Sequence, residues 1–360
     1  MDLKTGGPGE AWTEAGENLE SIASEEGVEN IINLHPAFAF HADEYRSQWT
    51  FASMRNMDIT KGKLRLNVEG RFQDFSTQFA IPDTAGVWNI VRNVMVFSLK
   101  ADPGNVLQKQ IAAYEAVRKK YKPSFSCTTP FKTIASFFDD IFYPAIGNLR
   151  SPLRAYVRQL MQSNPVEISR LRSHFQAEVQ TPALERYLAT FNDYFRLFAQ
   201  FQQVLTHVRV GSDDVDDLIV GSKRFDEIKL YYGQAYETLT SGYATLACLN
   251  NITAGRPFDQ FKSMTLNKYI SDVDKAKRSN PFADEPSLIA FAEFENSALR
   301  NGSHHASIWR DGDVIKFRSG GTGAEKDMAY SRYMHTCNGI TIAIAALLLV
   351  ELEMFSTIAL

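Results

Sequence analysis

The chain has 360 residues, of which 44% are hydrophobic and 22% charged, with a formal net charge of −4 and a pI near 6.0. These values are ordinary for a soluble protein that is long enough for two domains. They exclude a generally basic nucleic-acid-binding chain, so any RNA must be bound by a local positive patch. Three isolated cysteines without zinc-type spacing indicate reduced thiols, no metal site and a cytoplasmic location.

The beginning of the chain is polar. Residues 1–29 are rich in glycine and glutamate and hold few large apolar side chains, which predicts a disordered acidic segment. Apolar and polar residues alternate at 64–68, which predicts a half-buried strand with residues 72–81 as its partner. The residue pattern of the apolar segment 87–99 does not decide whether it is a helix or a strand.

Helices dominate from residue 106 onward. Residues 106–120 are amphipathic and residues 131–143 are apolar and aromatic. Three prolines are each expected in the first turn of a further helix: Pro152, Pro165 and Pro182. Aromatic residues at helical spacing between 187 and 205 are typical of a buried helix face.

An acidic stretch between about 207 and 222 is expected to separate two domains. Residues 30–210 would form a mostly helical α+β domain, and residues 211–360 an antiparallel four-helix bundle with a β-hairpin insertion. The protein is therefore expected to be mainly α. The predicted elements of the bundle are helices at about 223–250, 258–278, 285–299 and 327–352, with a hairpin at 307–317 that turns at Asp311-Gly312.

Two further patterns argue against a membrane and a cofactor. The longest uncharged run, Thr336 to Val350, is shorter than the roughly 20 residues that span a bilayer, so a helix buried in the bundle is expected. The glycine-rich stretch 319–323 lacks the Lys-Ser/Thr that completes a phosphate-binding loop.

Arginines recur every four residues at Arg150, Arg154 and Arg158, which places three cations on one helix face. Such a face suits the phosphate backbone of RNA, and we consider these arginines candidate RNA-binding residues. A solvated face, or ion pairs with acidic segments, is an equally good interpretation.

The motif that carries chemistry is Arg300-Asn301-x-x-x-His305, at the end of the third helix expected in the bundle. Gly302 allows the helix to end there, so that the arginine and the histidine can converge. Arginine supplies a permanent planar cation that matches a phosphate, and histidine carries a proton near neutral pH. Phosphodiester transfer without a metal requires these two groups.

The sequence Arg300-Asn301-Gly302-Ser303-His304-His305 resembles the R-polar-x3-H signature of the HEPN superfamily. The resemblance covers roughly residues 222–360. It implies a homodimer that cleaves RNA without metal, through attack of the 2′-OH and formation of a 2′,3′-cyclic phosphate. A role as a toxin or antiviral effector, with an unknown regulatory partner, is expected by analogy alone.

The resemblance also implies roles for single residues. His305 would be the general acid or base, with His304 able to share that role, and Arg300 would stabilise the transition state. Asn301 would orient the site. Many members carry an acidic residue on the first bundle helix, for which the candidates are Asp226, Glu227 and Glu237. Members of the toxin branch carry a tyrosine where this chain has Ser307, so adenylylation there is not expected.

Two other functions stay open. A non-catalytic HEPN dimer could serve as a nucleotide-binding or assembly module, and the bundle could serve oligomerisation alone. An open cleft in front of Arg300 and His305 favours the enzyme, whereas burial or ion pairing of these side chains favours a purely structural bundle.

Overall fold

The structure is a computed structural model that describes residues 40–41, 81, 83–100, 103–120, 125–221, 225–304, 307–318 and 323–358. The expected disordered segment, the predicted strand at 64–68 and nearly all of its partner lie outside these residues. His305 also lies outside them.

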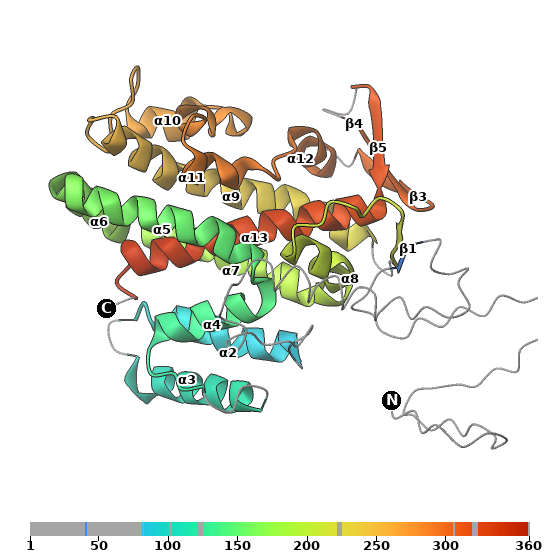
Figure 1. The fold of residues 1–360 in the computed structure, drawn as a ribbon, viewed down its shortest axis with the longest axis horizontal. Coiled ribbons are helices and arrows are strands. Elements are labelled where there is room, and N and C mark those ends of the chain that lie inside the picture. Colours follow the sequence, from blue (N-terminus) through green and yellow to red (C-terminus); the bar gives the residue numbers. More distant parts are fainter. Residues whose placement is uncertain are drawn as a thin grey trace, which may run out of the picture. The chain divides into compact units, whose positions relative to one another are not determined.

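The described part of the chain is mainly helical (Figure 1). Its α-helices are α2 (Thr84–Phe97), α3 (Gly104–Lys119), α4 (Pro130–Phe142), α5 (Ala145–Ser163), α6 (Pro165–His174), α7 (Gln180–Arg196), α8 (Phe198–Arg209), α9 (Phe225–Thr253), α10 (Leu266–Asp272), α11 (Pro286–Ile289), α12 (Ser297–His304) and α13 (Tyr330–Met354). The segment 87–99, whose type the sequence left open, is almost entirely helix α2.

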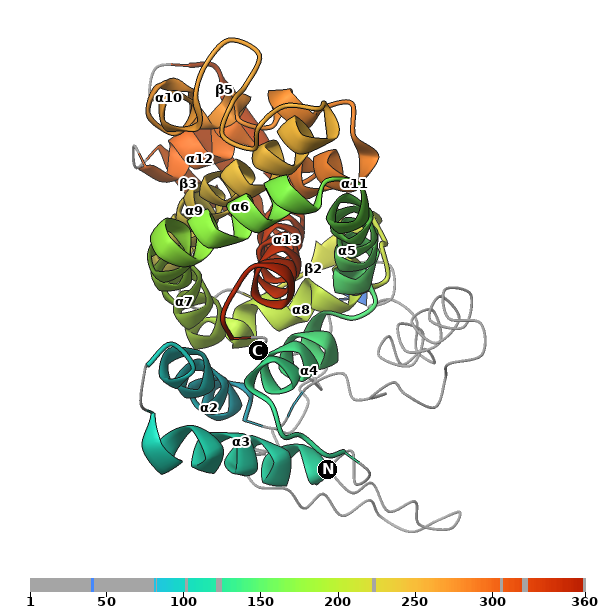
Figure 2. The same cartoon turned by 90° about the vertical axis from the view of Figure 1, so that its left-hand side faces the viewer.

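Helix α13 lies at the centre of the helices, as Figure 2 shows by looking along it. It packs against α4, α5, α7, α8 and α9, and every residue from Gly339 to Leu352 is buried. An apolar surface on all sides is typical of a helix inside a core. Although α13 is long and apolar enough to cross a bilayer, 94% of its most hydrophobic window is buried inside the protein.

The predicted domain boundary near residue 211 falls in the turn that follows α8. Helices on both sides of that turn pack on α13 and contribute to one hydrophobic core. The short strand β2 (Leu218–Ile219) pairs with β1 (Phe40–His41) just after the turn.

Several helices differ from their predicted positions. Pro152 lies inside α5 and not in its first turn, on the exposed side where water can bind the carbonyl that loses its partner. The predicted helices at 258–278 and 285–299 are each broken into short pieces. Three 3₁₀ turns lie between or beside these pieces: η4 (Lys275–Lys277), η5 (Asn280–Phe282) and η6 (Ala290–Ala292).

The breaks have local causes in the sequence. The Asp274 carboxylate accepts a hydrogen bond from the Ala276 amide, and the Glu285 carboxylate accepts one from the Ser287 amide. Such side chains compete with helical hydrogen bonds and start new turns. Pro281 and Pro286 strengthen both breaks, because proline favours a first turn and disfavours the interior of a helix.

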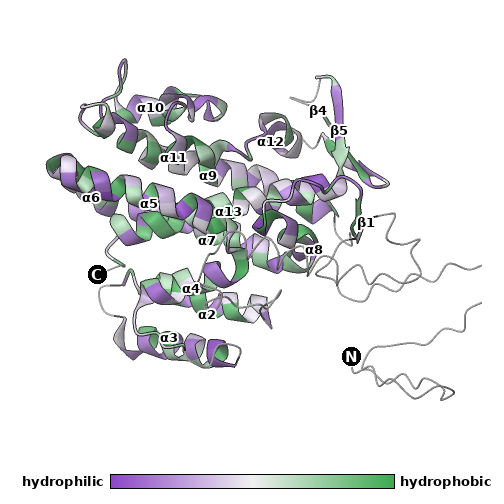
Figure 3. Cartoon of the chain, in the orientation of Figure 1, coloured by the Kyte–Doolittle hydropathy of each residue, from purple (hydrophilic) through white to green (hydrophobic). Residues whose placement is uncertain are grey.

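The segment expected to form a hairpin belongs to a three-stranded antiparallel sheet of β3 (Ile308–Asp311), β4 (Val314–Arg318) and β5 (Glu325–Ala329). Gly312 takes the positive φ of 61° in the turn between β3 and β4. The sequence predicted a helix from Asp327, whereas residues 325–329 form the third strand. This strand is strongly hydrophilic (Figure 3), as suits an exposed strand at the edge of a sheet.

Candidate functional site

Helix α12 carries Arg300 and Asn301 of the motif and is fixed to α9 at its beginning. The Asn296 side chain accepts a hydrogen bond from the Leu299 amide at 3.0 Å and so caps α12. The Asn296 amide donates to the hydroxyl of Tyr232 on α9 at 2.7 Å, and that hydroxyl donates to the carbonyl of Phe294. These contacts set the position of Arg300, one turn further along.

The Arg300 guanidinium is bound by a carboxylate from α9. Its Nε lies 2.7 Å and its Nη2 2.6 Å from Oε1 of Glu237, while Nη1 donates to Oδ1 of Asn301 at 2.9 Å. The Arg300 side chain remains 33% exposed. Of the three acidic candidates on this helix, the structure brings Glu237 to Arg300, whereas Asp226 pairs with Lys229, and Glu227 with an arginine of α7.

Two further side chains approach the same carboxylate. The Nζ of Lys275 contacts Oε2 of Glu237, and Nε2 of His304 lies 3.7 Å from Oε1. We call Glu237, Lys275, Arg300 and His304 the Glu237 cluster. Sequence reasoning missed Lys275 because residues 258–278 were expected to form one continuous helix, and nothing in the local pattern connects this lysine with the motif.

A glycine allows α12 to lie close to α9. Gly233 precedes Glu237 by one helical turn, and a Cβ added there would lie 3.1 Å from Cβ of Ser303 and 3.4 Å from Nε2 of His304. A larger side chain would therefore push the end of α12 outward. The missing side chain of Gly233 thus helps to hold His304 beside the cluster.

The Glu237 cluster has an excess of positive charge. Burial, together with the positive charges of Arg278 and Arg300, lowers the pKa of Lys275 to about 8. The pKa of Lys275 is lowered even though its ammonium contacts the Glu237 carboxylate. Arg278 is 7% exposed and donates to backbone carbonyls, including that of Ile270 at 2.6 Å.

The predicted RNA-binding arginines lie elsewhere, on α5. All three approach one carboxylate on α13, that of Glu353. The guanidinium nitrogens of Arg150, Arg154 and Arg158 lie 3.9, 2.5 and 3.6 Å from its oxygens. Arg150 also contacts Asp139 at 3.3 Å. Within the described residues no ion pair joins these arginines to the Glu237 cluster. Their ion pairs agree with the second interpretation of this pattern, although the Arg158 side chain stays 55% exposed.

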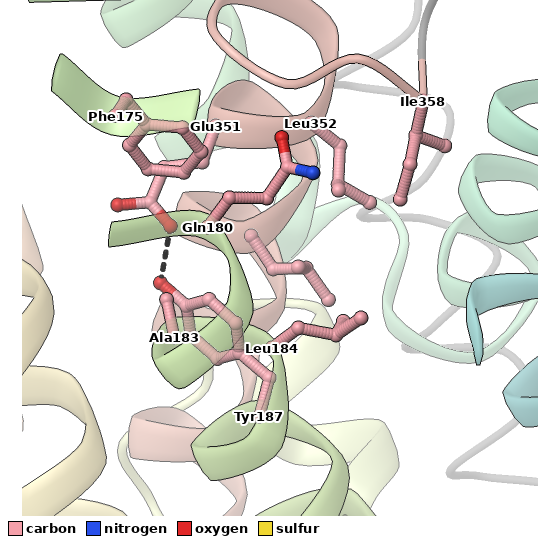
Figure 4. A pocket seen from close by; sticks show the side chains of 9 residues that line it. Phe175, Gln180, Ala183, Leu184, Tyr187, Glu351, Leu352 and Ile358 are labelled. Atoms are coloured by element: carbon pink, nitrogen blue, oxygen red, sulfur yellow. Dashed lines mark hydrogen bonds between the residues drawn. The ribbon is translucent and has the colours of Figure 1, made fainter. Parts of the chain in front are cut away.

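A second acidic side chain, Glu351, is buried on α13, away from the motif. It is 1% exposed and accepts hydrogen bonds from Tyr187 and Thr245, each at 2.6 Å. Figure 4 shows the bond from Tyr187 beside a small, mostly apolar pocket. Burial raises the pKa of Glu351 to about 7. Sequence reasoning took Glu351 only as the end of an uncharged run.

Among the described residues, no group of three or more histidine, cysteine or acidic side chains is arranged to hold a metal ion. The three cysteines are buried and free. No family model, no curated protein and no solved structure matches this chain.

Proposed function

We propose that the chain is a metal-independent endoribonuclease of HEPN type that acts as a homodimer. The observation that carries the proposal is that Glu237 holds one edge of the Arg300 guanidinium while the Arg300 side chain stays 33% exposed, so the ion pair orients this arginine without burying it. The HEPN resemblance implies an acidic residue on the first helix of the bundle that supports the motif, and we assign this role to Glu237 on α9.

The proposed reaction uses the RNA's own 2′-OH. A base removes the proton of that hydroxyl, its oxygen attacks the adjacent phosphorus, and the bond from phosphorus to the 5′-oxygen breaks. An acid then protonates the 5′-oxygen, leaving a 2′,3′-cyclic phosphate and a 5′-OH. His305 would exchange these protons, with His304 as its neighbour.

Arg300 would stabilise the negative charge that develops on the phosphate oxygens. Glu237 and Asn301 already bind three of its nitrogens, so the guanidinium is oriented before RNA arrives. Each terminal nitrogen carries a second N–H that points away from these partners and can reach a phosphate oxygen. In a symmetric dimer, two such motifs would meet near the two-fold axis.

A non-catalytic HEPN dimer that binds a nucleotide or serves assembly is the second candidate. The neutralisation of Arg300 by Glu237 within the same chain favours a structural role, including a bundle that serves oligomerisation alone. Cytoplasmic action as a toxin or antiviral effector, with helices α2–α8 selecting the target, belongs to the enzymatic proposal.

The test is incubation of the purified protein with labelled RNA in EDTA. We expect cleavage that leaves 2′,3′-cyclic phosphate ends, and a loss of about 10²–10⁴ in rate for His305→Ala and for Arg300→Ala. Arg300→Lys should not restore full activity, because an ammonium lacks the two-pronged geometry. Arg170→Ala, which removes a 48% exposed, ion-paired cation on α6, is the matched control and should cleave normally.

Cleavage only with added divalent metal would contradict the mechanism, as would a His305→Ala protein that cuts as fast as the wild type. The non-catalytic interpretation would then be favoured.

A further inference from the structure

We infer that Lys275 is a second phosphate-binding residue of the Glu237 cluster, beside Arg300. The inference rests on the proposed function and adds to it a residue outside the RNxxxH motif. Lys275 comes from η4, between α10 and α11, and reaches the same carboxylate as Arg300 from the other side.

The two carboxylate oxygens of Glu237 bind different cations. Oε1 binds Arg300 and Oε2 binds Lys275, so a single carboxylate holds both cationic groups next to each other. A lysine ammonium carries three N–H donors, and the described contacts use one of them on Glu237. Donors therefore remain on both cations for a negatively charged ligand.

The charge balance around Lys275 also favours an anion. One carboxylate, Glu237, faces the positive charges of Lys275 and Arg300, while Arg278 and Arg186 lie close enough to oppose protonation of Lys275. Asp274, which caps η4 through the Ala276 amide, and Asp272, the last residue of α10, are the acidic neighbours of the turn. A bound phosphate would offset this excess and favour the charged form of Lys275.

The turn that carries Lys275 is held firmly. Arg278 donates to the carbonyls of Val273, Thr240 and Ile270, and the Arg278 carbonyl accepts from the buried hydroxyl of Tyr269 at 2.6 Å. These contacts join η4 to α9 and α10. Lys275 is thus a partly exposed cation on a fixed turn, with a side chain that is 28% exposed. Because the turn is already ordered, RNA binding does not have to order it.

The two cations suit different parts of an RNA backbone. The planar guanidinium of Arg300 matches the scissile phosphate with two N–H groups, whereas the ammonium of Lys275 is a compact charge that tolerates varied geometry. We therefore assign Lys275 to the phosphate next to the scissile one. In this arrangement Lys275 positions the strand, and it contributes to binding more than to the chemical step.

The test uses the full chain and a 2′-O-methyl RNA oligonucleotide, which lacks the attacking hydroxyl and cannot be cleaved. Its affinity is measured over a range of salt concentrations for the wild type, Lys275→Met, Lys275→Arg and Lys277→Met. Lys277 is exposed on the same turn and is the matched control. Melting curves establish that each variant is folded.

We expect Lys275→Met to bind about tenfold more weakly and to lower the salt slope by about 0.7, as for one lost phosphate contact on a single strand. Lys275→Arg should restore most of the affinity, and Lys277→Met should match the wild type. With cleavable RNA, Lys275→Met should raise KM and change kcat little, unlike Arg300→Ala.

An unchanged salt slope in Lys275→Met, beside a wild type that binds and cuts RNA, would overturn the inference and leave the proposed function intact. A wild type that binds the oligonucleotide but cuts no RNA would instead contradict the enzymatic proposal, while the salt slopes still decide the role of Lys275. A wild type that binds no RNA would overturn both.

Discussion

Replacing Glu351 by glutamine is expected to remove a large part of the pH dependence of folding. The carboxyl is 1% exposed and is bound by the hydroxyls of Tyr187 and Thr245, while no cation of the described residues lies within ion-pair distance. Burial raises its pKa from 4.5 to about 7. The folded chain therefore retains a proton that the unfolded chain releases at lower pH.

Because the folded chain binds the Glu351 proton more tightly than the unfolded chain, protonation of Glu351 stabilises the fold. The Glu351 proton stabilises the fold fully below about pH 4.5, and this contribution is lost as the pH rises toward 7. The difference corresponds to roughly 3 kcal/mol in the free energy of unfolding, at about 1.4 kcal/mol for each pKa unit. Glu351→Gln carries no such proton, so its stability relative to the wild type should increase by roughly this amount between pH 4.5 and pH 8.

Urea unfolding followed by circular dichroism at several pH values measures this relative stability. Glu353→Gln, on the same helix, is the control. It removes the carboxylate that three arginines share and should lower stability, with no comparable gain at high pH. Wild-type and Glu351→Gln curves that stay parallel across the whole range would refute the reasoning, because they would mean that burial does not perturb this carboxyl.

Two other predictions concern the site and the assembly. Gly233→Ala should slow RNA cleavage by moving the end of α12 and His304, while stability changes by less than about 1 kcal/mol, since the better helix propensity of alanine offsets the crowding against Ser303. An unchanged rate would show that the close approach of α12 is unimportant. Light scattering at micromolar concentration should give twice the chain mass of 40.6 kDa, because the proposed site needs two copies. A monomer that persists with RNA present would count against the dimer.

Much of the helical fold could be predicted from local patterns. The helices at 106–120 and 131–143 lie within one or two residues of their predicted positions, and so does the start of α6 at Pro165. The long apolar segment at 336–350 is a buried core helix, as expected. These segments carry their own periodicity and start signals, so the sequence around each is sufficient to predict them.

The remaining features depend on contacts between distant residues. Glu237 and Arg300 are 63 residues apart, and the three acidic candidates on α9 are equivalent in sequence until the fold brings one of them to α12. Lys275 could not be connected with the motif because capping by Asp274 breaks the expected helix. The placement of Pro152 failed for a similar reason, since packing of α5 against α13 outweighs the local cost of proline inside a helix.

The central position of α13 has a consequence for synthesis on the ribosome. Helices α4, α5, α7, α8 and α9 all pack on a segment that follows them in the chain, so none of them has its final neighbour until residues 330–354 have emerged. During translation the apolar faces of these helices therefore lack the helix on which they pack in the folded protein. A nascent chain that stops before Tyr330 would expose them to chaperones and proteases, so the fold that holds the Glu237 cluster would be completed only late in synthesis.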